Sequence, residues 1–162
     1  MEDVERWMRR ALELAKQGEA DPGSSPIGCV IVRNGKVLGE GHNEVEKQND
    51  STSHAEIVAI RRAGASAQSW ELRGATLYSA LQPCGMCSNA TIGSKIGRVV
   101  YGAGRHKVYK LYFEDWHIDT LEFFADARRG GIEVRAGVLA EECAALYYKP
   151  HDAVPVKEQA NL

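Results

Sequence analysis

Two short motifs of metal-binding residue types constrain how this chain can fold: His-Ala-Glu at residues 54–56 and Pro-Cys-Gly-Met-Cys at residues 83–87. Zinc binds neutral imidazole and thiolate readily, and a catalytic zinc site uses three protein ligands and keeps a fourth position open for water. One histidine and two cysteines supply that number. The sequence therefore predicts a fold that brings His54, Cys84 and Cys87 together around one zinc ion per chain.

Glu56 is the candidate for proton transfer at this site. Cys84 and Cys87 lie at the expected start of a helix, where the helix dipole favours thiolates. Two thiolates reduce the effective charge of the metal, so a nearby general base becomes valuable. Glu56 follows His54 by two residues and can move protons from water to a ring nitrogen and then to a leaving amine.

Each motif also has a purely structural interpretation. Ser53 and Glu56 have the spacing of a capping box, in which both side chains satisfy backbone N–H groups at a helix start. A single Cys-x-x-Cys pair is also typical of a redox pair or of half a structural zinc site. A structural zinc site needs a fourth ligand, and no further histidine or cysteine is paired with either motif. The two motifs together therefore favour the catalytic interpretation.

Hydrophobic spacing and turn residues predict helices and strands along the chain. The pair Asn34-Gly35 between two β-rich runs predicts an antiparallel hairpin, and a helix between two later strands predicts that those strands pair in parallel. Gly18 and Gly64 are expected to end their helices. The expected helices are 4 to the stop at 18, 53–63, 84–95, 109–128 and 139–148; the expected strands are 29–33, 36–41, 75–80, 98–103 and 132–135.

Length and composition predict one domain over residues 1–150, followed by a polar tail over 151–162. The 162 residues are 44% hydrophobic, which is enough for one compact core. A formal net charge of −2 shows no basic excess, so nucleic acid is not expected as a partner. The apolar runs are too short for a membrane-spanning helix, so we expect no membrane partner and a cytoplasmic protein. In that reducing compartment, Cys29 and Cys143 are expected to be buried core residues.

With these motifs in place, the sequence resembles the cytidine and deoxycytidylate deaminase superfamily, and in particular its branch of nucleobase deaminases and tRNA adenosine deaminases. The pairing of His-x-Glu with Pro-Cys-x-x-Cys is the signature of zinc deaminases. The likeness covers residues 26–146 and includes Gly-His-Asn at 41–43 and Arg-Val-Val-Tyr-Gly-Ala at 98–103. The resemblance implies an α/β fold, a three-layer α/β/α sandwich around a five-stranded mixed sheet, and a homodimer.

The resemblance also implies two substrate contacts. Asn43 matches an asparagine that hydrogen-bonds the substrate, and the backbone near Ala55 helps to line the pocket. The chain departs from the family in two places: Gln82 stands where many relatives carry glutamate, and Ile-Gly-Cys at 27–29 replaces the commoner Phe-Gly-Ala. Neither departure affects the metal chemistry, but both bear on which substrate is bound.

The segment 109–117 resembles the Phe-acidic-acidic stretch of guanine deaminases. Glu114 or Asp115 is expected to accept hydrogen bonds from ring N–H and amino groups, while Trp116 or a neighbouring aromatic residue stacks on the ring. The aromatic residues of this segment also have helical spacing, which is typical of an apolar stripe without a ligand. The two interpretations stay open at this stage.

The main functional prediction is a zinc-dependent hydrolase that converts the exocyclic amine of a free nucleobase or related small heterocycle, of the guanine, cytosine or triazine type, to a carbonyl. The substrate would then be a small heterocyclic amine. A tRNA-specific adenosine deaminase is the first alternative, weakened because the tail 151–162 is not basic. A non-catalytic zinc-binding module is the second.

Overall fold

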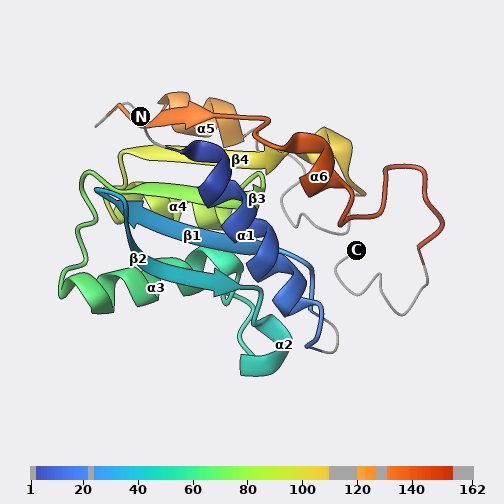
Figure 1. The fold of residues 1–162 in the computed structure, drawn as a ribbon, viewed down its shortest axis with the longest axis horizontal. Coiled ribbons are helices and arrows are strands. Elements are labelled where there is room, and N and C mark those ends of the chain that lie inside the picture. Colours follow the sequence, from blue (N-terminus) through green and yellow to red (C-terminus); the bar gives the residue numbers. More distant parts are fainter. Residues whose placement is uncertain (1–2, 22–23, 110–119, 127–130, 155–162) are drawn as a thin grey trace.

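The computed structural model describes residues 3–21, 24–109, 120–126 and 131–154, and its core is a mixed β-sheet (Figure 1). Within these residues the sheet has five strands in the order β2-β1-β3-β4-β5. β1 pairs antiparallel with β2 and β3, while β3, β4 and β5 run parallel. This confirms the predicted sheet, hairpin and parallel pair. The strands are β1 (Gly28–Arg33), β2 (Lys36–His42), β3 (Thr76–Leu81), β4 (Arg98–Ala103) and β5 (Glu133–Arg135).

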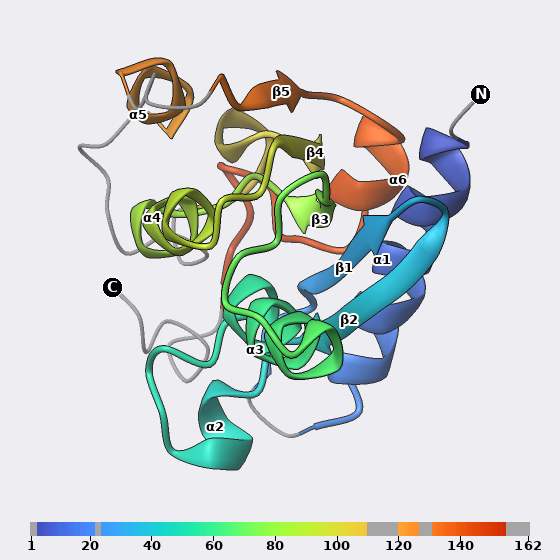
Figure 2. The same ribbon diagram turned by 90° about the vertical axis from the view of Figure 1, so that its left-hand side faces the viewer.

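Helices cover both faces of this sheet. Figure 2 shows α1 (Val4–Gly18) and α6 (Ala140–Ala144) on one side, and α3 (Ala55–Ala67), α4 (Gly85–Gly93) and α5 (Thr120–Asp126) on the other. The short α2 (Val45–Gln48) lies in the connection between β2 and α3, and a 3₁₀ turn, η1 (Arg105–Lys107), follows β4. The predicted three-layer α/β/α sandwich is therefore confirmed.

The α1 helix forms because its apolar residues recur at helical spacing and its first turn is capped. The Asp3 carboxylate accepts a hydrogen bond from the backbone N–H of Arg6 (3.0 Å), and Trp7 and Met8 lie on the buried face. An ion pair also joins α1 to the sheet: two guanidinium nitrogens of Arg10 bind the two carboxylate oxygens of Glu40 on β2, at 2.7 and 2.8 Å. Such bidentate pairs fix orientation as well as distance.

The α3 helix lies unusually close to β2 because β2 has glycines where it meets the helix. A Cβ atom at Gly39 would lie 2.4 Å from the carbonyl oxygen of Ala59, and one at Gly41 would lie 2.6 Å from that of Ala55. Since no side chain fits there, the sequence of β2 determines how far the first turn of α3 lies from the sheet.

Several predicted boundaries differ from the structure. Gly64 does not end its helix: α3 continues to Ala67 and ends at Gln68, whose left-handed backbone (φ 48°) lets the N–H of the next residue, Ser69, bond the carbonyl of Gly64 (3.1 Å). The helix α6 is shorter than predicted because the chain tightens after Ala144 into turns with i→i−3 hydrogen bonds. Cys29 and Cys143 are buried, as expected.

Parts of two other predictions fall outside the described residues. Of the helix predicted over 109–128, the described part is helical at Thr120–Asp126, while 110–119 and 127–130 are not described. The division into a domain over 1–150 and a tail from 151 stays a prediction, because 155–162 lie outside as well. Within the described part of the chain, no helix is both long and apolar enough to cross a membrane.

The close contact between α3 and β2 predicts that Gly41→Ala destabilises the fold. The added methyl group would lie 2.6 Å from the carbonyl oxygen of Ala55 and 2.9 Å from the nitrogen of Ala59, so the helix must shift. We expect the free energy of unfolding, measured in urea, to fall by about 1–3 kcal/mol. Gly93→Ala is the control, because nothing lies within 4 Å of its added Cβ. Equal stability of the two variants would contradict the close contact.

Candidate metal and catalytic site

The starts of α3 and α4 converge and bring together the three predicted metal ligands. His54 is the N-cap residue of α3 and Cys84 that of α4, with Cys87 in the first turn of α4. Neither N-cap side chain makes a capping hydrogen bond, so the imidazole and the thiol are available to each other. The Nδ1 atom of His54 lies 3.6 Å from the Sγ of Cys84 and 3.7 Å from the Sγ of Cys87.

These distances fit a tetrahedral zinc site. With Zn–S bonds of about 2.3 Å and a Zn–N bond of about 2.0–2.1 Å, tetrahedral angles place nitrogen about 3.6 Å from each sulfur. All three ligand atoms lie within 4.8 Å of one another. Cys87 is fully buried, whereas His54 is only partly buried, so the site can be reached from solvent. Three ligands leave one position for water, as in catalytic zinc sites.

The two cysteines have different ionisation states without metal. Hydrogen bonding from Cys87, together with His54, lowers the pKa of Cys84 to about 4, so Cys84 is a thiolate at neutral pH. The bond to Cys84 and burial raise the pKa of Cys87 well above its ordinary value. Binding of a zinc ion therefore requires Cys87 to lose its proton.

Glu56 points into the site, where its carboxylate bonds side chains of β3 and α4. It is buried, its Oε1 accepts a hydrogen bond from the Ser79 hydroxyl (3.2 Å), and its Oε2 accepts one from the Cys87 thiol (3.5 Å). Ser53 donates its hydroxyl to Asp50 instead (2.8 Å), so the capping-box interpretation is wrong. Burial, followed by the negative charge of Cys84, raises the pKa of Glu56. A carboxyl with a raised pKa is suited to accept and return a proton near neutral pH.

The predicted substrate contacts are only partly within the described structure. Asn43 is nearly buried at the end of β2, and Ala55 is the fully buried first residue of α3. The backbone N–H of Glu44 donates to the carbonyl of Ser53 (2.9 Å), so the residue after Asn43 is held beside the residue before His54. Their roles toward a substrate stay predictions. The same holds for the remaining three residues, Glu114, Asp115 and Trp116, which lie outside the described residues.

Two polar residues near the site were missed by the sequence analysis. Ser79, which binds Glu56, stands in a strand that is buried throughout, and a polar residue in such a strand is itself a signal. Glu44 had no such signal. Burial raises its pKa, but hydrogen bonds from Arg62 and Gln48 outweigh that effect, so its pKa lies below the ordinary value.

Gln82 connects the metal-binding loop to the chain beyond β4. Its Oε1 accepts the backbone N–H of Arg105 (3.0 Å), which orients the amide so that Nε2 donates to the hydroxyl of Thr120. The side chain thus uses both a donor and an acceptor. The structure accommodates this departure from the family pattern with a buried amide that is bonded through both its oxygen and its nitrogen.

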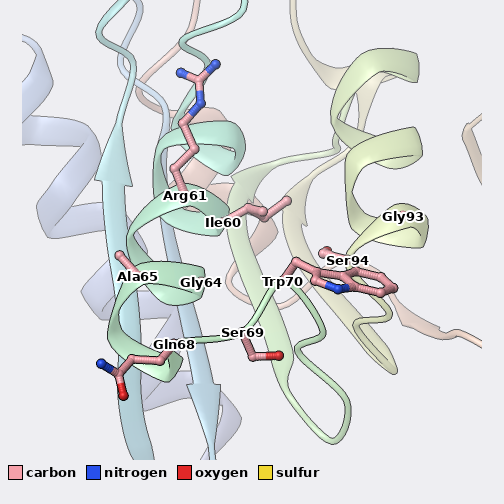
Figure 3. Close-up of a pocket in the computed structure, with 9 residues that line it drawn as sticks. All are labelled: Ile60, Arg61, Gly64, Ala65, Gln68, Ser69, Trp70, Gly93 and Ser94. Atoms are coloured by element: carbon pink, nitrogen blue, oxygen red, sulfur yellow. The ribbon is translucent and has the colours of Figure 1, made fainter.

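A separate cavity of about 600 Å³ lies between the C-terminal ends of α3 and α4 (Figure 3). The exposed Trp70 extends toward Gly93 and Ser94 across it. None of its lining residues is a metal ligand or Glu56, so it is distinct from the metal site. The lining residues are Ile60, Arg61, Gly64, Ala65, Gln68, Ser69, Trp70, Gly93 and Ser94.

Comparisons with known proteins identify the family. Residues 1–103 match the model of the cytidine and deoxycytidylate deaminase zinc-binding region. A curated relative from Buchnera aphidicola (subsp. Schizaphis graminum), named tRNA-specific adenosine deaminase, is 38% identical over 138 residues, which are 85% of this chain and 87% of the relative.

Two solved structures are also similar. One, from a study of A-to-I editing by tRNA:A34 deaminases at the wobble position of transfer RNA, has a TM-score of 0.75 and 32% identity and covers 87% of this chain and 98% of its own. The other, guanine deaminase from Bacillus subtilis, has a TM-score of 0.61 and 36% identity and covers 64% of this chain and 66% of its own.

These comparisons correct the predicted substrate. The free-nucleobase prediction is wrong, because curated relatives that are 36–39% identical over 85–89% of this chain are named tRNA-specific adenosine deaminase. The expectation that nucleic acid is no partner loses its support for the same reason. It rested on net charge, whereas binding to phosphates depends on the Lys and Arg residues at the contact surface. The chain belongs to the cytidine and deoxycytidylate deaminase family and is a zinc-dependent hydrolytic deaminase.

Proposed function

We propose that this chain is a tRNA-specific adenosine deaminase. The observation that carries this proposal is the 38% identity to the Buchnera relative of that name, across 85% of this chain and 87% of the relative. In the reaction, the C6–NH₂ bond of the adenine ring breaks, the carbon gains the oxygen of water as a carbonyl, and the amino group leaves as ammonia.

His54, Cys84 and Cys87 are the residues that would hold zinc. When bound, zinc supplies a nucleophile by lowering the pKa of water. The histidine contributes through Nδ1, the atom that faces both sulfurs. His54 is half-buried, so a substrate can approach the site from the side of His54. Cys87 is fully buried and lies on the inner side of the site.

Glu56 carries the proton transfers in this proposal. Its carboxylate takes a proton from the attacking water and delivers it to the ring nitrogen beside the reacting carbon, then moves a second proton to the leaving amine. The Ser79 hydroxyl holds Oε1, which leaves Oε2, the oxygen beside Cys87, to face the metal site. One carboxylate thus serves as base and then as acid.

Asn43 is the proposed contact to the base. Its side-chain Oδ1 accepts the backbone N–H of Val45 (3.2 Å), so its amide group is held in one orientation. The amide NH₂ then offers donors to an acceptor on the substrate. The fully buried backbone at Ala55 would line the same pocket.

Glu56→Gln is expected to separate folding from chemistry. Gln keeps the shape and can still accept the hydrogen bond of Ser79, but it cannot take a proton at neutral pH. We expect zinc content and Tm close to wild type and a loss of about 10²- to 10⁴-fold in kcat. The exposed Glu46 provides the matched control, because Glu46→Gln changes the same group away from the site. Turnover by Glu56→Gln within a few-fold of wild type would assign the proton transfer elsewhere.

The substrate is tested by comparing a tRNA anticodon arm with free adenosine, adenine, guanine and cytosine. We expect kcat/KM for the tRNA substrate to exceed that for each free compound by at least about 100-fold, since most binding energy would come from the nucleic acid. The apparent affinity for tRNA should also fall steeply as salt is raised. Efficient release of ammonia from a free base, with negligible inosine formation in tRNA, would contradict the proposal.

A further inference from the structure

Glu44 is a buried carboxylate that joins three elements next to the metal site. Its side chain is 4% exposed, and its Oε1 binds Nη2 of Arg62 on α3 at 2.7 Å. Its Oε2 accepts a hydrogen bond from the side-chain amide of Gln48 on α2, and Nε2 of His42 at the end of β2 lies 3.9 Å from Oε1. A buried carboxylate with several donors is held in one position.

Arg62 connects this carboxylate to the helix that carries the reactive groups. While Nη2 binds Glu44, its Nη1 donates to the backbone carbonyl of Glu40 on β2 (3.0 Å). Arg62 belongs to α3, whose first turn holds His54 and Glu56. The guanidinium therefore fixes the loop after β2 and the strand itself to the same helix.

The residue before Glu44 is Asn43, whose backbone is held on two sides. Its N–H donates to the carbonyl of Ile27 (3.1 Å), and its own carbonyl accepts the hydroxyl of Ser24 (2.8 Å). Its side-chain Oδ1 is occupied by Val45, whereas its NH₂ has no partner within the described part of the chain. Asn43 as a whole is 7% exposed, and this donor can bond an acceptor from outside the chain.

We propose that Glu44 is a positioning residue: through its ion pair with Arg62 it fixes the Asn43 amide relative to His54 and Glu56 and so sets the affinity for the substrate base. The inference rests on the proposed function only in taking Asn43 as the substrate contact. Glu44 itself touches neither metal ligand nor Glu56 in any hydrogen bond or ion pair among the described residues. It acts by placing its neighbour.

Exposure argues against a mainly structural role for this pair. The Arg62 side chain is 52% exposed, so solvent screens its charge and reduces what the pair adds to global stability, and Gln48 still donates to the Glu44 carboxylate when Arg62 is removed. A shift of the loop, in contrast, moves Asn43 directly. Loss of the pair should therefore affect substrate binding more than unfolding.

The test compares Glu44→Ala, Arg62→Ala and the double variant with wild type, using steady-state kinetics on the tRNA anticodon arm, zinc content and Tm. We expect each single variant to raise KM by at least about tenfold with kcat within about threefold and zinc retained. The double variant should resemble the single variants, because each already breaks the same contact. If Glu44→Ala does not fold, Arg62→Ala alone carries the test.

Arg10→Ala is the matched control. It removes a bidentate ion pair between α1 and Glu40, on the sheet face opposite α3, so it should lower Tm without changing KM. Unchanged KM in Arg62→Ala, equal KM changes in Arg10→Ala, or additive effects in the double variant would each overturn the assignment.

Hydrogen–deuterium exchange of the substrate-free protein separates this inference from the proposed function. Arg62→Ala should increase exchange at the Glu44 N–H, which bonds the carbonyl of Ser53, and Arg10→Ala should not. A wild type that leaves tRNA unchanged would count against the proposed function. Unchanged exchange at Glu44 in Arg62→Ala would overturn the positioning role whatever the substrate proves to be.

Discussion

The close contact of α3 with β2 is the constraint on which the site depends. Glycines at 39 and 41 let the helix backbone approach the strand to distances that any side chain would prevent. The first turn of α3 is therefore fixed against the sheet, and with it His54 and Glu56. Because β3 leads directly into the loop before α4, the same sheet positions Cys84 and Cys87. Candidate metal ligands from two segments that are far apart in the sequence thus lie close together in space.

Hydrogen bonds within the site and burial together shift the pKa values of its groups. The pKa of Cys84 is lowered by its neighbours while that of Cys87 is raised, so one sulfur is already ionised and the other must release a proton to bind metal. The pKa of Glu56 is raised by burial and by the charge of Cys84, and a raised carboxyl pKa suits the proposed proton transfer near neutral pH. The hydroxyl of Ser79 restricts this carboxylate to one orientation.

The sequence allowed the grouping of the candidate metal ligands and the layered fold to be predicted, and it indicated Glu56 as the proposed proton carrier, since each depends on local spacing: His54 and Glu56 in one helical turn, Cys84 and Cys87 in another. Contacts made across the sheet were not predictable in this way. The bond from Ser79 to Glu56 and the pair between Glu44 and Arg62 join residues whose proximity only the tertiary structure determines. Net charge is a weak guide to a nucleic-acid partner, because it averages over the whole surface, whereas binding to phosphates depends on the Lys and Arg residues at the contact surface.

The central claim, an open zinc site made by His54, Cys84 and Cys87, is tested most directly by metal analysis combined with X-ray absorption spectroscopy of the purified protein. One zinc per chain is expected, with two sulfur ligands at about 2.3 Å, one protein nitrogen at about 2.0–2.1 Å and one oxygen. The Cys87→Ala protein should lose the metal. A zinc ion with four sulfur or nitrogen ligands, or full zinc content in Cys87→Ala, would contradict the account.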